Sequence, residues 1–347
     1  MTPFLTTIMF FFLGLGTTIT FASSHWMLAW MGLEINTLAI LPFMSLPHHP
    51  RAVEASTKYF LVQATAAATL LFAGISNAWF TGQWDILQTS HPLPTTLAIL
   101  ALSMKIGLAP LHYWLPEVLQ GLSYPTALIL STWQKLAPCI LLIQVVPSHP
   151  NILTWLGLLS ILIGSWGGLG QLQLRKILAY SSIAHLGWMA VVMQFSLQIS
   201  LLILLTYIIM TSAMFLVFNL NKTTNIAMLA TSWAKAPTLS SLTPLVFLSL
   251  GGLPPLTGFV PKWLAIQELT TQNQTLVALL AAQAALIGLY FYLRLARTMS
   301  MTFSPNNPPG TTPWRLPIVQ HTLPLALSVI ISISLFPLTP MIVAMIS

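Results

Sequence analysis

The strongest constraint on the fold is a succession of apolar segments that are each long enough to cross a bilayer. A membrane-spanning helix needs about 20 mostly apolar residues. Eleven segments meet this requirement, and proline-rich sequences such as 47–50 and 147–150 separate them, as is typical of loops. We predict an all-α polytopic membrane protein, one transmembrane domain over 1–347, with about 11 transmembrane helices at 3–22, 25–46, 57–80, 93–117, 123–146, 151–171, 175–195, 197–219, 238–268, 275–298 and 321–345.

The composition excludes the main alternatives to a membrane protein. The chain has 12 lysines and arginines and 5 aspartates and glutamates in 347 residues, whereas a soluble domain carries about a quarter charged residues. Disordered chains are also charge-rich. The basic residues form no stripe, so the pI of about 9.8 does not indicate nucleic-acid binding. The single cysteine, Cys139, excludes an intrachain disulfide and any metal or iron–sulfur site built from cysteines alone.

The positions of the basic residues predict the orientation of the chain. Lysine and arginine collect in loops on the cytoplasmic or matrix side of a membrane. The loops after the second, sixth, eighth and tenth expected helices, with the adjoining helix ends, hold nine of the 12 basic residues, namely Arg51, Lys58, Arg175, Lys176, Lys222, Lys235, Arg294, Arg297 and Arg315. The loops after odd-numbered helices hold none. We therefore expect the N-terminus on the positive side and the C-terminus on the opposite side.

The remaining basic residues mark candidate functional positions inside the membrane. Lys105, Lys135 and Lys262 all fall within expected spans, and Glu34 lies near the middle of the second. A charge at bilayer depth costs at least about 2.5–3.5 kcal/mol, so such residues are functional candidates by default. Desolvation disfavours the ammonium form of a lysine, which allows a buried lysine to load and release a proton near neutral pH.

An internal repeat places two of these residues at interrupted helices. Residues 107–117 (GLAPLHYWLPE) match residues 252–262 (GLPPLTGFVPK) without gaps, with five identities in eleven positions. The expected topology runs the two segments in opposite directions. We therefore predict two inverted-topology repeats, 1–146 (helices 1–5) and 151–298 (helices 6–10), each with a broken helix, followed by a C-terminal helix at 321–345. Broken helices in inverted repeats are typical of ion-coupled transporters.

Two histidines extend the list of candidate residues. His112 lies seven residues after Lys105, and a continuous helix would place both on one face about 10 Å apart along the axis. His185 lies near the middle of the seventh expected helix. Histidine exchanges protons near neutral pH. The alternative interpretation is that these histidines and lysines are satisfied polar groups or ion pairs that bridge helices. No CxxC, P-loop or dinucleotide-binding sequence is present.

At this point the sequence resembles a known family. The segment 175–187 (RKILAYSSIAHLG) resembles the signature of the antiporter-like membrane subunits of respiratory complex I and of multisubunit cation/proton antiporters. Segment 30–36 (WMGLEIN) and the whole-chain pattern are most similar to the vertebrate mitochondrial branch. Bacterial relatives usually have fourteen helices. The resemblance therefore implies three fewer N-terminal helices here, and a lipid or another subunit in the space that they leave.

The resemblance implies a role for each matching residue. Glu34 matches a glutamate that pairs with the lysine of the first broken helix, here Lys105. Lys135 matches the connecting lysine of a hydrophilic axis, and Lys262 matches a terminal lysine that exchanges protons with the positive space. His112 and His185 match positions on this axis that hold water. These six residues form the expected proton relay.

The resemblance also implies the setting of the chain. It is that of a proton-translocating subunit of NADH:ubiquinone oxidoreductase in the mitochondrial inner membrane, with its N-terminus in the matrix and its C-terminus in the intermembrane space. No cofactor is expected on this chain; NADH, FMN, iron–sulfur clusters and ubiquinone belong to other subunits. Expected partners are small membrane subunits on one side, another antiporter-like subunit on the other, accessory subunits and lipid. Two alternatives remain open: a free-standing cation/proton antiporter, and a structural or assembly subunit that conducts no protons.

Overall fold

The computed structural model describes residues 3–46, 48–89, 91–145, 150–234, 237–300 and 322–346. Within these ranges the chain is helical, with two isolated β-bridges and no strand. It divides into two compact units, residues 1–160 and residues 161–347. The predicted all-α fold is confirmed.

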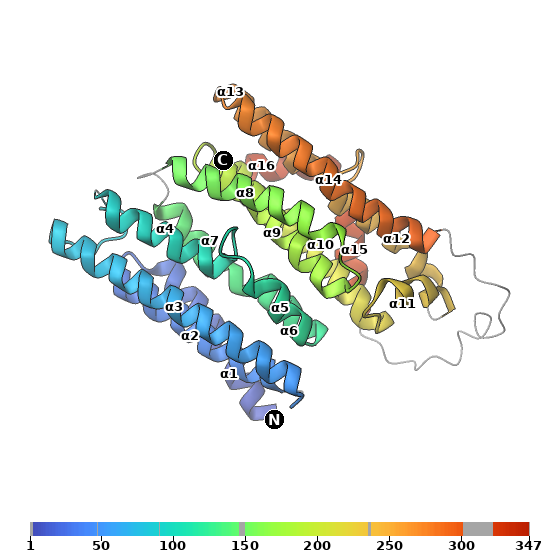
Figure 1. Ribbon diagram of the computed structural model, residues 1–347, viewed down its shortest axis with the longest axis horizontal. Coiled ribbons are helices and arrows are strands. Elements are labelled where there is room, and N and C mark those ends of the chain that lie inside the picture. The colour runs from blue at the N-terminus through green and yellow to red at the C-terminus, as the bar shows by residue number, and fades with distance from the viewer. Residues whose placement is uncertain are drawn as a thin grey trace. The chain divides into compact units, whose positions relative to one another are not determined.

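The first unit contains seven helices before the chain reaches the boundary (Figure 1). α2 packs between α1 and α3, and α4 packs against α3 and α7. The short helix α5 also lies against α3, so α3 contacts both parts of the first broken helix. The bounds are α1 (Pro3–Ala22), α2 (Trp26–Ser45), α3 (Pro50–Thr81), α4 (Pro92–Ile106), α5 (Trp114–Gly121), α6 (Tyr124–Ser131) and α7 (Trp133–Val145).

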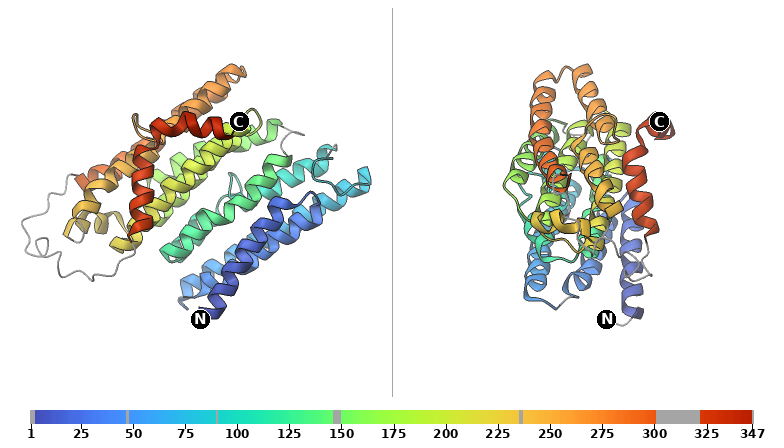
Figure 2. Two further views of the ribbon diagram at one scale, coloured as in Figure 1. Left: turned by 180° about the vertical axis from the view of Figure 1, so that it is seen from behind. Right: turned by 90° about the vertical axis from the view of Figure 1, so that its right-hand side faces the viewer.

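The second unit is built around α10, which contacts α9, α12, α13 and α15. α8 (Pro150–Leu169) crosses the boundary between the units in sequence. The last two α-helices meet at a bend of 69° that is clear in Figure 2. The remaining bounds are α9 (Leu174–Val192), α10 (Leu197–Asn221), α11 (Ile226–Ala230), the 3₁₀ helix η2 (Thr231–Ala234), α12 (Pro237–Gly251), α13 (Phe259–Thr271), α14 (Thr275–Ser300), α15 (Leu323–Ser334), the 3₁₀ helix η5 (Phe336–Leu338) and α16 (Thr339–Ile346).

Each of the eleven expected spans contains one α-helix or two successive α-helices. Among the described residues, seven helices are long and apolar enough to cross a membrane, or eight with the bent pair α15–α16. The expected start of the third span at residue 57 is wrong, because α3 begins at Pro50 with His49 as its N-cap. The His49 Nδ1 accepts a hydrogen bond from the Arg51 N–H. His321, at the expected start of the last span, lies outside the described residues, as do Lys235 and Arg315 of the orientation argument.

Both units contain the same helix break at equivalent positions. Gly107 directly follows α4 and Gly252 directly follows α12, with backbone φ angles of 87° and 80°. In each case the N–H of the residue after the glycine donates to a carbonyl five residues back, from Leu108 to the Ser103 carbonyl and from Leu253 to the Leu248 carbonyl. This hydrogen-bond pattern is the Schellman helix end. Glycine is favoured at its left-handed position because glycine has no Cβ. The Ala109–Pro110 and Pro254–Pro255 peptides that follow are both cis.

A second shared feature ties loops together in each unit. The loop before α2 pairs with the loop before α4, with hydrogen bonds from Trp26 N–H to the Trp84 carbonyl (3.0 Å) and from Ile86 N–H to the Ser24 carbonyl (2.9 Å). The loop before α9 pairs in the same way with the loop before α11, through two backbone N–H···O=C hydrogen bonds of 3.1 Å and 3.2 Å. The two units therefore share this loop pairing as well as the break. Their inverted orientation stays a prediction.

Replacement of Gly107 by alanine is expected to destabilise the chain by about 1–2 kcal/mol, because an L-residue is strained at this positive φ. The Cβ would also lie 3.0 Å from the Leu115 side chain. Gly14 is a matched control, since a Cβ there meets nothing within 4 Å and alanine favours helix. Thermal unfolding in detergent measures both variants. Equal melting temperatures for Gly107→Ala and the unchanged chain would contradict this account of the break.

Candidate functional site

A small polar cavity lies inside the first unit at the end of α4. Helices α2, α3, α4, α5, α6 and α7 contribute its walls, and the volume open to the centre of a water molecule is about 20 Å³. This is enough for about one water molecule. Its walls include both Lys105 and Lys135 together with uncharged polar side chains, namely Asn36, Thr37, Tyr59, Gln63 and Gln134. The cavity brings the two predicted lysines of this unit to one site.

Lys105 lies in the last turn of α4, where its side chain is buried. The C-terminal end of a helix carries partial negative charge, which favours an ammonium there. Among the described residues, the Lys105 Nζ, both side-chain polar atoms of Asn36 and the Gln63 Nε2 have no hydrogen-bond partner. Buried polar groups are rarely left unsatisfied, and the adjacent cavity has room for the water that would satisfy them.

Glu34 lies half-buried near the middle of α2, as predicted, and it interacts electrostatically with Lys105 and Tyr59. Its Oε2 accepts a hydrogen bond of 2.8 Å from the Thr37 hydroxyl, and Thr37 lines the cavity. No direct ion pair joins Glu34 to Lys105 in the part of the chain that the structure describes. The carboxylate therefore acts on Lys105 through space and not through a direct ion pair.

Lys135 reaches the same cavity from α7 and is buried. The neighbouring Gln134 donates a hydrogen bond of 3.1 Å to the Asn36 carbonyl of α2, which holds α7 against α2 at this level. Lys135 also interacts electrostatically with Cys139, one turn further along α7. The lysine side chains of α4 and α7 therefore line one cavity although they lie 30 residues apart in sequence.

His112 is buried but does not share a helical face with Lys105. α4 ends at Ile106 and α5 begins at Trp114, so His112 lies in the turns between them and the predicted spacing of two helical turns is wrong. The glycine and proline residues that end α4 are the physical reason. The His112 ring hydrogen-bonds to the Pro110 backbone and packs at a tilt of 31° against the Tyr113 ring, with ring centroids 4.4 Å apart.

Lys262 occupies the break of the second unit. It lies in the first turn of α13, half-buried, and its Nζ donates to the Gly251 carbonyl (2.8 Å) and the Leu250 carbonyl (3.4 Å) at the end of α12. In the repeat alignment Lys262 corresponds to Glu117, whereas Lys105 corresponds to Leu250. Each unit thus places one ammonium group at the C-terminal end of the first half of its broken helix, but from different elements.

His185 is the second ionisable residue predicted for this unit. It is buried on α9, and its ring lies 6.0 Å from the ring of Tyr207 on α10. The structure places it in the helix interior, as expected, and α13 also packs against α9. Of the six predicted residues, four lie in the first unit and two in the second.

Sequence reasoning missed the uncharged polar residues of the cavity. Asn36, Tyr59, Gln63 and Gln134 line the cavity but carry no charge, so the positions of charged residues and histidines do not identify them. The sequence does contain a signal for the amide residues, because an amide side chain inside an apolar span also needs a polar partner. In the described part of the chain, no group of three or more histidine, cysteine or acidic residues is arranged to hold a metal ion.

Comparison with known proteins identifies the family to which this fold belongs. A family model described as the transmembrane region of the NADH:quinone oxidoreductase/Mrp antiporter family matches residues 23–288, and one described as the C-terminus of NADH dehydrogenase subunit 2 matches residues 289–343. A chain of respiratory complex I from Thermus thermophilus superposes with a TM-score of 0.87 at 27% identity over 99% of this chain and 80% of that chain. A structure of the Mrp complex from Dietzia has a TM-score of 0.78 at 17% identity, covering 95% of this chain and 74% of that one, which supports the fold alone.

The fold and its two helix breaks thus define an antiporter-like membrane subunit. NADH-ubiquinone oxidoreductase chain 2 of Tetraodon nigroviridis is 64% identical over 98% of both chains, and that of Oncorhynchus mykiss is 60% identical over 100% of both. The chain belongs to the family of NADH-ubiquinone oxidoreductase chain 2.

Proposed function

We propose that the chain is a membrane-arm subunit of proton-translocating NADH:ubiquinone oxidoreductase that relays protons through its buried ionisable residues. The observation that carries this proposal is the water-sized cavity into which Lys105 and Lys135 both project. The relay in the first unit uses Glu34, Lys105, Lys135 and His112. The relay in the second unit uses His185 and Lys262.

The chemistry of these groups fits a relay driven from elsewhere. Each lysine can hold one proton and pass it to water, and a nearby carboxylate such as Glu34 biases whether the lysine keeps it. Moving one charge through about 100 mV costs about 2.3 kcal/mol, so a moderate electrostatic change at one group can move a proton at the next. The proposal places no redox centre on this chain, and electron transfer from NADH to ubiquinone takes place on other subunits.

The setting follows from the same family. The relatives are chains of a vertebrate NADH-ubiquinone oxidoreductase, so the chain is assigned to the mitochondrial inner membrane with other subunits of that complex as partners. The distribution of lysine and arginine supports an N-terminus in the matrix and a C-terminus in the intermembrane space. Small membrane subunits would flank it on one side and another antiporter-like subunit on the other, with lipid at the exposed apolar surface.

Replacement of Lys135 by methionine tests the relay. Methionine fills nearly the same volume but holds no proton, so the assembled complex in vesicles is expected to translocate fewer protons per NADH oxidised. Lys222→Met is the matched control, because Lys222 is exposed at the end of α10, and it should leave the ratio unchanged. An unchanged ratio for Lys135→Met would remove Lys135 from the proposed path.

A further inference from the structure

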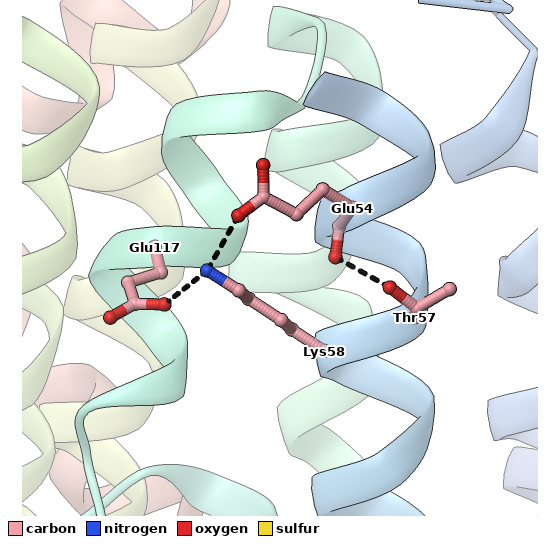
Figure 3. Close-up of polar contacts among 4 residues, drawn as sticks. All are labelled: Glu54, Thr57, Lys58 and Glu117. Atoms are coloured by element: carbon pink, nitrogen blue, oxygen red, sulfur yellow. Dashed lines mark hydrogen bonds and ion pairs between the residues drawn. The ribbon is translucent and has the colours of Figure 1, made fainter. Parts of the chain in front are cut away.

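Three charged side chains join α3 to α5 at the edge of the first unit. The Lys58 Nζ lies 2.8 Å from the Glu54 Oε1 and 2.8 Å from the Glu117 Oε2, so one ammonium bridges two carboxylates (Figure 3). The side chain of Lys58 is 42% exposed, that of Glu54 is 62% exposed and that of Glu117 is 54% exposed. We call Glu54, Lys58 and Glu117 the charged triad. Arg51 adds a further electrostatic interaction with Glu54 from one turn away.

The charged triad belongs to an antiparallel contact that leads to the cavity. Gly121 lies against the Arg51 carbonyl and the Ala55 side chain, where a Cβ would come within 2.6 Å and 2.7 Å of them. Closer to the break, Glu117 of α5 meets Lys58 of α3. Beyond these contacts, the rings of Trp114 and Tyr59 lie 5.7 Å apart. The two helices therefore stay in contact from the surface to the helix break.

At its inner end, the contact between α3 and α5 forms part of the cavity wall. Tyr59 follows Lys58 directly and Trp114 precedes Glu117 by three residues, and both rings line the cavity. One helical turn is about 5.4 Å, so the triad lies about one turn from the cavity wall. Gln63, one turn beyond Tyr59, is 3% exposed and its Nε2 has no partner among the described residues. An unsatisfied donor beside a water-sized space indicates hydration at the inner end of this contact.

The internal repeat indicates that this position has a task in both units. Glu117 corresponds to Lys262, whose ammonium contacts the carbonyls of the helix break. The same repeat position thus carries an ionisable group in each unit, a lysine directed toward the break in one and a carboxylate held by Lys58 near the surface in the other. A surface carboxylate can exchange protons with the surrounding water, which a half-buried lysine bonded to backbone carbonyls does less readily.

We propose that the charged triad is the site at which protons enter the first unit, with Glu117 as the proton acceptor and Lys58 as the residue that positions it. This inference rests on the proposed relay. Glu117 accepts a proton from the surrounding water and becomes neutral, and Lys58 is then held by Glu54 alone. Glu117 next gives the proton to water that leads past Tyr59 and Trp114 to the cavity, and the carboxylate recovers its bond to Lys58.

The charged triad is exposed, and surface ion pairs contribute little to stability. Removal of one of its charges should therefore leave the complex assembled. We expect Glu117→Gln in the assembled complex to lower the number of protons translocated per NADH oxidised by as much as Lys105→Met. Because the two groups act in series on one path, the double variant should lose no more than either single variant. Glu117→Asp should restore translocation, and the control Glu268→Gln, at the far end of α13, should not change it.

The outcomes separate the entry site from the relay. If Lys105→Met lowers the proton ratio and Glu117→Gln does not, or if their losses add in the double variant, the entry site is wrong and the relay stands. If Lys105→Met has no effect, the proposed function itself fails. A second measurement uses the unchanged complex. Modification with a water-soluble carbodiimide should abolish proton translocation in proportion to labelling at Glu117, and labelling of Glu117 without loss would overturn the proposal.

Discussion

Replacement of both Lys105 and Lys135 by methionine is expected to abolish the contribution of this chain to proton translocation while the complex still assembles. Both side chains are buried and line one cavity of about 20 Å³, reached from α4 and α7. Methionine keeps the volume of the walls, so packing should survive. Asn36, Gln63 and Gln134 remain to bind water, but no group in the cavity would then store a proton.

The measurement is the number of protons translocated per NADH oxidised by the purified complex in sealed vesicles. Leu102→Met with Leu141→Met is the matched control, since it introduces two methionines at fully buried positions of the same two helices. We expect the control to translocate protons at the unchanged ratio. A full ratio in the double lysine variant would refute the relay. Failure of the lysine variant to assemble, with normal assembly of the control, would favour a structural role for the buried charges.

The sequence was sufficient to predict the class of fold and the helix breaks. Strongly apolar segments have one stable form in a membrane, because every backbone polar group must be satisfied within the helix. The matched segments at 107–117 and 252–262 likewise predicted breaks that the structure contains, at Gly107 and Gly252. These predictions depend on local chemistry, which the sequence records directly.

Properties that depend on tertiary packing were harder to predict. The start of α3 was misplaced, because Arg51, Glu54 and Lys58 interrupt the apolar pattern although His49 and Pro50 form a good helix start. His112 was assigned to a helical face that the break removes. The cavity depends on which faces of α2, α3, α4 and α7 meet, and this is decided by tertiary packing and not by the local chemistry of each segment.

Replacement of Lys262 by arginine is expected to separate the structural task of this residue from its proton-carrying task. The Lys262 ammonium caps α12 by donating to the Gly251 and Leu250 carbonyls, and the negative end of the helix dipole stabilises its charge. Arginine keeps the charge and the donors, so it can preserve this cap. Arginine does not give up its proton in proteins, so it cannot pass one on.

We therefore expect Lys262→Arg to assemble with near-normal thermal stability and to translocate fewer protons per NADH oxidised. Lys262→Met should lose both properties, because it leaves the carbonyls at the end of α12 without their donor, at a cost of about 1–2 kcal/mol. Lys222→Arg, exposed at the end of α10, is the control and should change neither. Normal translocation by Lys262→Arg would show that Lys262 acts only as a cap. The second unit would then need a different proton carrier, and His185 on α9 is the remaining candidate of the predicted set.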